Sequence, residues 1–471
     1  MEVRITDAVV NNPEQRLKAP VNFTFNKGEA VAVVGRNGAG KSLVANIIMD
    51  TFPLIQGKAE YMFEQTPEWV YQKIKLLAFK DAYGADDSSY YYQQRWNSTE
   101  QEGYPTVEEF LGSGILEKSD LFDMKAHAGY RLVHLSSGEL RKVQIIKALS
   151  SDPELLIIDN PFIGLDASSR GEFSAALKAI SKKVGIILLL SDLLALPDFI
   201  THVYTVKDCS DFRKYSVREY LLNPPFKVED GRRELSEQKR RAISELPVSG
   251  KGTSEYVVRL KDVTIGYGGK TILNKVCWDI KRGEHWALSG HNGSGKSTLL
   301  NLITADNPQS YACDIELFGR KRGSGESIWD IKREIGYVSP ELHRAFQKNV
   351  SVREIVASGL LDTVGLYVRP PKEKMSSCDF WMDMFGISGI AGKMFLRISS
   401  GEQRLALLAR AFVKDPQLLI LDEPLHGLDT YNRILTREII DEFCKRDGKT
   451  LIMVTHYPQE LPSCIDKIKQ L

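Results

Sequence analysis

The chain contains two copies of the motif Gly-x-x-x-x-Gly-Lys-Ser, at residues 35–42 and 290–297. In such a loop the glycines let backbone N–H groups curl around phosphate oxygens, the lysine reaches the β and γ phosphates, and the hydroxyl ligates Mg²⁺. Lys41 and Lys296 are therefore assigned to phosphate, and Ser42 and Ser297 to Mg²⁺. Two matches at corresponding positions of a repeat predict two sites for a nucleotide such as ATP.

An apolar run that ends in aspartate follows each loop, and the two runs differ in the next residue. Asp159 and Asp422 end the runs, where a carboxylate helps to hold the metal through water. Glu423 follows in the second copy and can polarise water, whereas Asn160 in the first can hold a water but cannot take its proton. The sequence therefore predicts one hydrolytic site and one mainly structural nucleotide site.

A Ser-Ser-Gly-Glu element precedes each of these apolar runs, at residues 136–139 and 399–402. Serine and glycine before a helix commonly form an N-cap, which would give the element a purely structural role. Its placement in both copies just before the aspartate run instead favours a role in nucleotide binding.

The elements that must position these residues are short apolar runs alternating with helical patterns. The runs are residues 30–34, 155–158 and 186–190 in the first copy and 286–288, 418–421 and 451–454 in the second. Continuous apolar runs of this length are typical of strands buried on both faces of a parallel sheet. With helical patterns at 139–149 and 402–413, each half is predicted to be a layered α/β domain.

Length and composition favour two such domains without a global charge bias. The 471 residues are about three times a usual domain length of roughly 150, and 62 basic residues nearly balance 61 acidic ones. No nucleic-acid partner is therefore expected. Six dispersed cysteines suggest reduced thiols, and no leader or membrane-spanning run is apparent, so we expect a cytoplasmic protein.

The expected boundaries are a first nucleotide-binding domain at 1–207, a linker at 208–255 and a second domain at 256–471. The linker is inferred from Pro224-Pro225, from the glycines at 231, 250 and 252, and from a mixed-charge stretch that could form a short exposed helix. Its basic residues, among them Arg240 and Arg241, are interpreted as a solvated face.

Each half also has a Gly-Leu-Asp triplet, at 164–166 and 427–429, after its aspartate strand. The chain resembles a tandem ABC ATPase over nearly its whole length, because both halves have the phosphate loop, the Ser-Ser-Gly-Glu element, the aspartate strand and this triplet in the same order. The resemblance implies two P-loop NTPase domains, each with a helical signature subdomain, that pack head to tail. Each ATP would lie between the phosphate loop of one half and the Ser-Ser-Gly-Glu element of the other.

The site residues that follow from this pairing fall into two sets. In the hydrolytic site Glu423 acts as general base, Lys296 binds phosphate and His456, matched by Asp192 in the first half, contacts the γ-phosphate. That site also contains Gly290, Asn292, Gly293, Gly295, Ser297, Thr298, Asp422, Ser136, Ser137, Gly138 and Glu139. The other contains Gly35, Asn37, Gly38, Gly40, Lys41, Ser42, Asp159, Asn160, Ser399, Ser400, Gly401 and Glu402. Tyr267 resembles the aromatic residue that stacks on adenine, or else is a half-buried strand residue.

Both halves depart from the family pattern where a glutamine is expected after an apolar strand. The second half has Pro340 and Glu341 there, and the first has Lys80 and Asp81. Glu341 or Asp81 could act in place of the glutamine through water, but the usual coupling to a permease is then in doubt.

The stretch 317–332 is similar to the ModF group of molybdate-transport or photorepair ATP-binding proteins. The expected function is the energising subunit of a membrane importer of molybdate or a related substrate, with the permease supplied in trans at the inner face of the plasma membrane. The alternatives are a permease-free regulatory or translation ATPase of the ABC-F kind and a DNA-repair-type ATPase. The balanced segment at 208–255 and Asn160 count against the ABC-F kind, and the lack of long coiled-coil or zinc insertions counts against the repair type.

Overall fold

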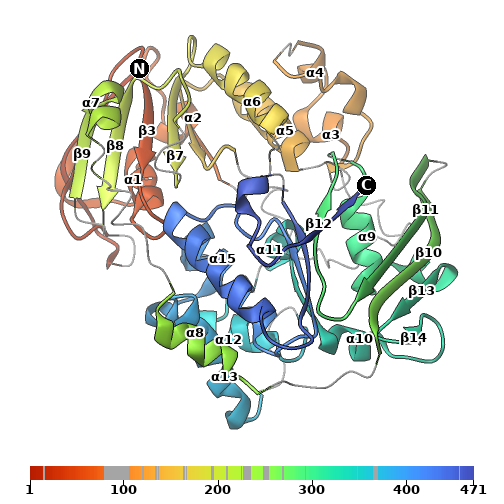
Figure 1. Cartoon of the computed structure of the whole chain (residues 1–471). Helices are drawn as coiled ribbons and strands as arrows, with labels where there is room; N and C mark the ends of the chain where they lie inside the picture. The colour runs from red at the N-terminus through yellow and green to blue at the C-terminus, as the bar shows by residue number, and fades with distance from the viewer. Residues whose placement is uncertain are drawn as a thin grey trace.

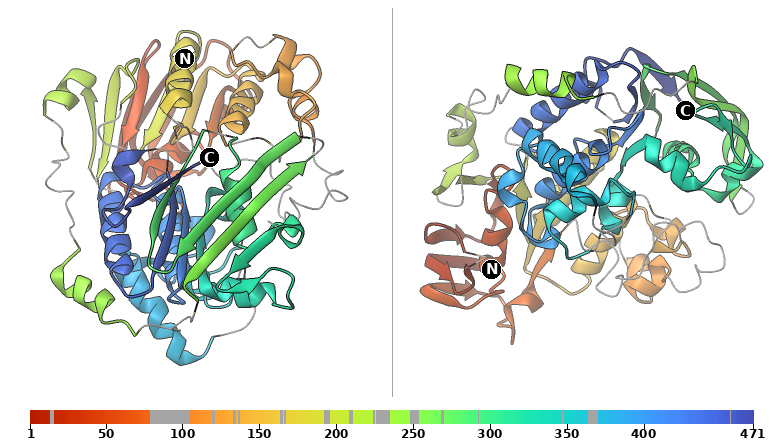
Figure 2. Two further views of the ribbon diagram at one scale, coloured as in Figure 1. Left: turned by 45° about the vertical axis from the view of Figure 1, so that its right-hand side comes forward. Right: turned by 90° about the horizontal axis from the view of Figure 1, so that it is seen from below.

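The computed structural model describes most of the chain. Residues 14–15, 79–104, 119–120, 133–134, 136, 163–164, 166, 192–195, 208–210, 224, 226–234, 248–253, 268–269, 292, 347, 364–369 and 456 lie outside the description. The first half, red to yellow in Figure 1, lies above the second half, green to blue. Figure 2 shows that each half combines sheets with flanking helices, which confirms the predicted α/β class.

The first half contains a six-stranded sheet and a three-stranded antiparallel sheet. The larger sheet has the order β5-β6-β7-β3-β8-β9 and the smaller one β2-β1-β4. Their bounds are β1 Glu2–Val10, β2 Val21–Phe25, β3 Ala30–Val34, β4 Leu54–Met62, β5 Ile74–Leu77, β6 Leu155–Asp159, β7 Gly185–Leu190, β8 His202–Lys207 and β9 Asp211–Ser216. Helices are α1 Lys41–Ile48, α2 Val70–Lys73, α3 Val107–Leu111, α4 Ile115–Lys118, α5 Ser137–Leu149, α6 Ala167–Ile180 and α7 Val217–Leu222.

The second half repeats this plan. Its parallel sheet has the order β15-β16-β17-β12-β18, which matches β5-β6-β7-β3-β8, and its antiparallel sheet is β11-β10-β13-β14. The strands are β10 Tyr256–Tyr267, β11 Lys270–Lys281, β12 His285–Ser289, β13 Asp314–Leu317, β14 Arg320–Lys321, β15 Ile335–Val338, β16 Leu418–Asp422, β17 Thr450–Val454 and β18 Lys467–Gln470. The helices are α9 Lys296–Ile303, α10 Ile328–Glu334, α11 Pro340–Ala345, α12 Val352–Ser358, α13 Lys372–Met384, α14 Ser400–Phe412 and α15 Thr430–Cys444.

The strands predicted from apolar runs form the centres of the two parallel sheets. β6 and β16 pair in parallel with β7 and β17, and their apolar residues are almost fully buried on both faces. The phosphate loops follow β3 and β12, so the loops and the strand-ending Asp159 and Asp422 lie at the same edge of each sheet.

The expected linker is more ordered than the sequence suggested. β9 pairs antiparallel with β8, and Phe212 stacks on Tyr204 with ring centroids 4.8 Å apart. Residues 211–216 therefore belong to the first sheet, because they pair with β8 and because Phe212 and Tyr215 pack against two different apolar clusters of the first half. The linker assignment from 208 onward was wrong for this strand.

Helix α8 (Glu237–Ser244), the mixed-charge part of the same segment, packs on α15 instead of projecting into solvent. Ile243 is fully buried, and Arg240 forms ion pairs with Glu438 at 3.0 Å and Glu442 at 2.7 Å. Arg241, on the opposite face, has 72 % of its side chain exposed, as the solvated-face interpretation expects. The expectation of an exposed helix was therefore wrong for one of its two faces.

Replacing Ile243 with alanine should test this docking. The substitution should lower the free energy of unfolding of the second half by about 2–4 kcal/mol, because it leaves a cavity under α8. Urea denaturation followed by tryptophan fluorescence measures the change. Arg241→Ala is the control, and its effect should stay within about 0.5 kcal/mol; equal effects of the two variants would show that α8 is not docked.

Candidate functional site

The two phosphate loops have the same internal geometry. Lys41 Nζ donates hydrogen bonds to the carbonyl oxygens of Gly35 at 2.8 Å and Arg36 at 3.0 Å. Lys296 Nζ donates to Gly290 at 2.7 Å and His291 at 3.0 Å. Each loop ends in a glycine that caps the following helix in the left-handed region, with φ of 105° at Gly40 and 95° at Gly295. These conformations explain the glycines of the motif.

The surroundings of the two loops differ. Lys41 is buried, at 7 % exposure, whereas Lys296 is only partly buried. A Cβ atom on Gly38 would lie 3.0 Å from Oε1 of Glu402 in the other half, whereas one on the matching Gly293 would have open space within 4 Å among the described residues. Among the described residues, the second half thus covers the first loop at Gly38 more closely than the first half covers the second loop at Gly293.

Direct contacts join the first loop to the second half. The backbone N–H of Asn37 donates to Asp429 Oδ2 at 2.9 Å, and its side-chain amide donates to the carbonyl of Gly427 at 3.0 Å. Gly401 approaches so closely that a Cβ there would fall 1.9 Å from Asn37 Nδ2. Arg36 lies over the ring of Tyr431, 5.5 Å from its centroid. The contact therefore depends on the absence of a side chain at position 401.

A cavity of about 840 Å³ lies between the first phosphate loop and the second half. It brings together ten of the residues predicted for the Asn160 site: Asn37, Gly38, Gly40, Lys41, Ser42, Asp159, Asn160, Ser399, Ser400 and Glu402. A cavity of this size, lined by a phosphate loop and by polar groups from another domain, is suited to a nucleotide.

The Ser-Ser-Gly-Glu element of the second half also caps a helix. Ser399 Oγ accepts from the backbone N–H of Glu402 at 3.3 Å, and Glu402 Oε2 accepts from the N–H of Ser399 at 2.8 Å. This capping box begins α14. The two roles weighed from the sequence therefore do not compete here, because the residues that form the cap also line the cavity.

In the second half, carboxylates gather at the end of β16. Burial, followed by the nearby Glu341 carboxylate, raises the pKa of Asp422 to about 7, and burial, followed by Asp422, raises the pKa of Glu423 well above its usual value. Lys296 acts on both groups in the opposite direction. The structure therefore places Lys296, Asp422, Glu423 and Glu341 close enough to interact electrostatically.

Glu423 and Asn160 occupy equivalent positions and share an uncommon backbone conformation, with φ of 50° and 48°. Each N–H bonds to the strand beside it, Glu423 to Val454 and Asn160 to Leu189, both at 2.9 Å. Left-handed backbone at a non-glycine residue often marks a functional site. The side chains differ, because Glu423 lies 3.3 Å from His426 Nδ1 whereas Asn160 donates to Asp159 Oδ1 at 2.8 Å.

One pair of buried arginines was missed from the sequence. Arg404 donates to the backbone oxygens of Asp422 at 3.0 Å and of Ser339 at 3.1 Å, and also to that of Glu423. Arg141 donates to the carbonyl of Asn160 at 3.1 Å. Both arginines stand four residues after the second serine of the Ser-Ser-Gly-Glu element. This spacing, repeated in both halves, could have predicted that the two arginines have equivalent roles. They fix the backbone that carries Glu423 and Asn160.

Several predicted residues lie outside the described part of the chain: Ser136, Asn292, His456 and its counterpart Asp192, together with Lys80 and Asp81 and the side chain of Ser137. Glu139 Oε1 lies 3.1 Å from His127 Nε2. Tyr267 is 36 % exposed and accepts a hydrogen bond from Asn307 Nδ2 at 2.8 Å, so its stacking on adenine stays a prediction.

Comparison with known proteins identifies the family. The family model described as ABC transporter matches residues 19–163 and 273–426. The chain belongs to the ABC transporter family of ATP-binding proteins. It is similar to the ABC transporter ATP-binding protein ModF of Escherichia coli, with 34% identity over 94% of this chain and 91% of that protein. An uncharacterized ABC transporter ATP-binding protein of Schizosaccharomyces pombe is 28% identical over 95% of this chain and 93% of that one.

This ABC protein also shares its fold with an archaeal ribosome recycling factor solved in complex with a ribosomal stalk protein. The TM-score is 0.51 at 19% identity, covering 98% of this chain and 87% of the other. Tandem ABC domains make the chain an ATPase, as predicted. None of the helices in the described residues has the length and apolar character needed to span a bilayer.

Replacing Gly401 with alanine should weaken ATP binding at the Asn160 site. The new Cβ would displace Asn37 and break two hydrogen bonds, each worth roughly 1 kcal/mol, so affinity should fall about tenfold or more. Equilibrium dialysis with labelled ATP, in a Lys296→Ala background that silences the other loop, measures this affinity. Gly138→Ala is the matched control, and equal affinities of the two variants would contradict the contact.

Proposed function

We propose that ATP draws the two halves together head to tail, that the second site hydrolyses ATP through Glu423, and that the first site holds ATP without turning it over. The observation that carries this proposal is the cavity in which the first phosphate loop faces Ser399 and Glu402 of the other half, with Asn160 where Glu423 stands in the second half.

In the second site, Glu423 is the group best placed to take a proton from water. Its carboxyl is buried and its raised pKa makes the carboxylate a stronger base than an exposed one. Lys296 would bind the phosphates, and Ser297 and Asp422 would hold Mg²⁺, whose positive charge supplies electrostatic stabilisation of the transferring phosphoryl group. Clustered buried carboxylates with raised pKa values fit such a cation, because its charge would offset their repulsion.

In the first site, Lys41, Ser42 and Asp159 provide the same binding groups, but Asn160 has no basic oxygen. Its amide already donates to Asp159 and its Oδ1 accepts from the N–H of Ser191 at 3.3 Å. Asn160 therefore holds the end of β6 in place. We infer that this site serves as a lasting ATP-bound joint between the halves.

The partner proposed to use this cycle is a membrane permease supplied in trans, with the chain bound at the cytoplasmic face of the membrane. Support comes from the similarity to ModF, which is named as an ABC transporter ATP-binding protein. Molybdate or a related substrate is the proposed cargo on the same resemblance.

The assignment of hydrolysis to one site is tested with Glu423→Gln. Turnover of ATP per chain should fall by about 100-fold or more, the usual contribution of a general base. Glu237→Gln changes the same side chain where 73 % of it is exposed on α8, and its turnover should equal that of the wild type. A Glu423→Gln variant that keeps half of the wild-type rate would place equal hydrolysis at the Asn160 site.

The same variant tests the partner, since blocked hydrolysis should keep the ATP-bound form closed on its target. We expect mass spectrometry of material co-purified from cells with ATP to recover a membrane permease with Glu423→Gln and less of it with Glu237→Gln. Recovery of ribosomes, or of no membrane protein, would contradict the transport role and favour the permease-free regulatory ATPase.

A further inference from the structure

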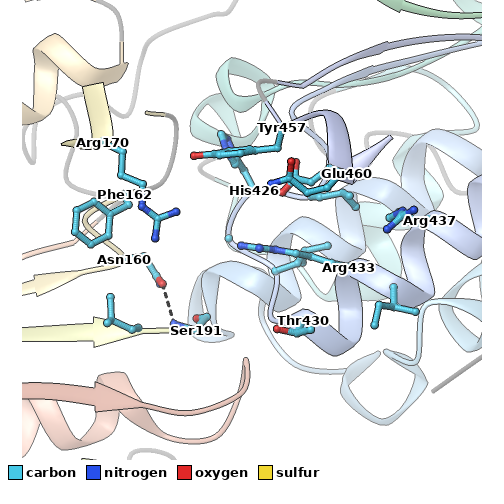
Figure 3. A pocket seen from close by; sticks show the side chains of 16 residues that line it. Asn160, Phe162, Arg170, Ser191, His426, Thr430, Arg433, Arg437, Tyr457 and Glu460 are labelled. Carbon is cyan, nitrogen blue, oxygen red and sulfur yellow. Dashed lines mark hydrogen bonds between the residues drawn. The ribbon is translucent and has the colours of Figure 1, made fainter. Parts of the chain in front are cut away.

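A second cavity of about 430 Å³ lies between the two halves (Figure 3). Its lining comes from the ends of β6 and β7 and from α6 in the first half, and from α15 and the segments before α15 and after β17 in the second. Asn160 and Ser191 line both cavities and so form a shared wall. Any molecule in this cavity would touch both halves.

The described part of the lining is basic. Among its described residues three arginines, Arg170, Arg433 and Arg437, stand against a single glutamate, Glu460. Glu460 accepts a hydrogen bond from Thr455 at 2.8 Å, which engages one of its oxygens. Arg170 comes from the first half and Arg433 from the second, and Figure 3 shows the two side chains on opposite sides of the cavity. A cavity with this charge favours an anion.

Two of these arginines, Arg437 and Arg170, also offer donors. Arg437 Nε is buried and has no hydrogen-bond partner among the described residues. Arg170 lies over the ring of Phe162, 4.9 Å from its centroid, a stacking contact that leaves the edge of the guanidinium available for hydrogen bonds. Guanidinium groups bind phosphate oxygens through paired, charge-assisted hydrogen bonds.

The cavity also reaches the hydrolytic carboxylate through one side chain. His426 is part of its lining, and His426 Nδ1 lies 3.3 Å from Glu423 Oε2. On the other wall stands Asn160, where the matching residue of the second half is a glutamate. A carboxylate at position 160 would repel an anion in this cavity, whereas the neutral amide does not.

We propose that this cavity binds inorganic phosphate, the product of ATP hydrolysis, between Arg170 of one half and Arg433 of the other. The source of the phosphate rests on the function proposed above. Bound in this way, phosphate bridges the halves, so they separate fully only after it has left. Asn160 then has a second role, in keeping the shared wall uncharged.

Phosphate binding is tested directly on the full chain carrying Lys41→Ala and Lys296→Ala, which removes the competing phosphate loops. Equilibrium dialysis with radiolabelled phosphate should find one phosphate bound per chain. Adding either Arg170→Gln or Arg433→Gln should weaken binding about tenfold or more, as expected for loss of a charge-assisted hydrogen bond. Arg241→Gln, exposed on α8, is the matched control and should leave binding unchanged.

Two results would overturn the inference: no binding at millimolar phosphate, or binding that Arg170→Gln and Arg433→Gln both leave unchanged. Because the two arginines come from different halves, a folding defect in one variant leaves the other informative. Turnover that depends on Glu423 in the unmodified chain, together with absent phosphate binding, would reject this inference alone and leave the proposed function intact.

Discussion

One buried carboxylate, that of Asp429, accepts hydrogen bonds from both halves and so joins them. Its Oδ1 accepts from the N–H of Asn432 at 2.8 Å and so caps α15, while its Oδ2 accepts from the N–H of Asn37 in the other half at 2.9 Å. A buried carboxylate needs several donors, and here one comes from each half. The same helix carries Arg433 and supports α8 through Glu438. A change at the first phosphate loop therefore acts on the helix that lines the cavity between the halves and supports α8.

The two halves share the order of their parallel strands but place different charges at the ends of β6 and β16. In the second half, Asp422 and Glu423 are both buried, and burial raises the pKa of both groups; the Glu341 carboxylate raises the pKa of Asp422 further, and Asp422 raises that of Glu423. In the first half, the amide of Asn160 removes one of these charges and bonds to Asp159. In the proposed function, a cation at the second site would offset the repulsion between these carboxylates, and the first site has less repulsion to offset. This difference is the basis of the proposal that one site holds ATP and the other hydrolyses it.

Much of the fold and of the two phosphate loops could be predicted from the sequence, because their signals are short, local sequence patterns. The apolar runs predicted the central strands, and the motifs predicted the phosphate loops that follow β3 and β12. Contacts between the halves were harder to predict from the sequence, because no local pattern indicates that Gly401 packs against Asn37. The sequence analysis did not predict that α8 docks on α15. Ile243 is the single buried residue of α8 and stands among charged neighbours, and the ion-pair partners of Arg240 on α15 lie about two hundred residues away in the sequence. The arginine-lined cavity exists only where the halves meet and leaves no continuous motif in the sequence.

The central claim, one holding site and one hydrolytic site, is tested most directly by identifying the nucleotide that remains bound during turnover. The chain would be supplied with labelled ATP and Mg²⁺ until turnover is steady, separated rapidly from free nucleotide, and its bound ATP and ADP counted per chain. The account predicts about one intact ATP per chain, retained unless Lys41 is replaced, while the other site exchanges and forms ADP. Loss of all bound ATP at the rate of turnover, with Lys41 intact, would contradict it.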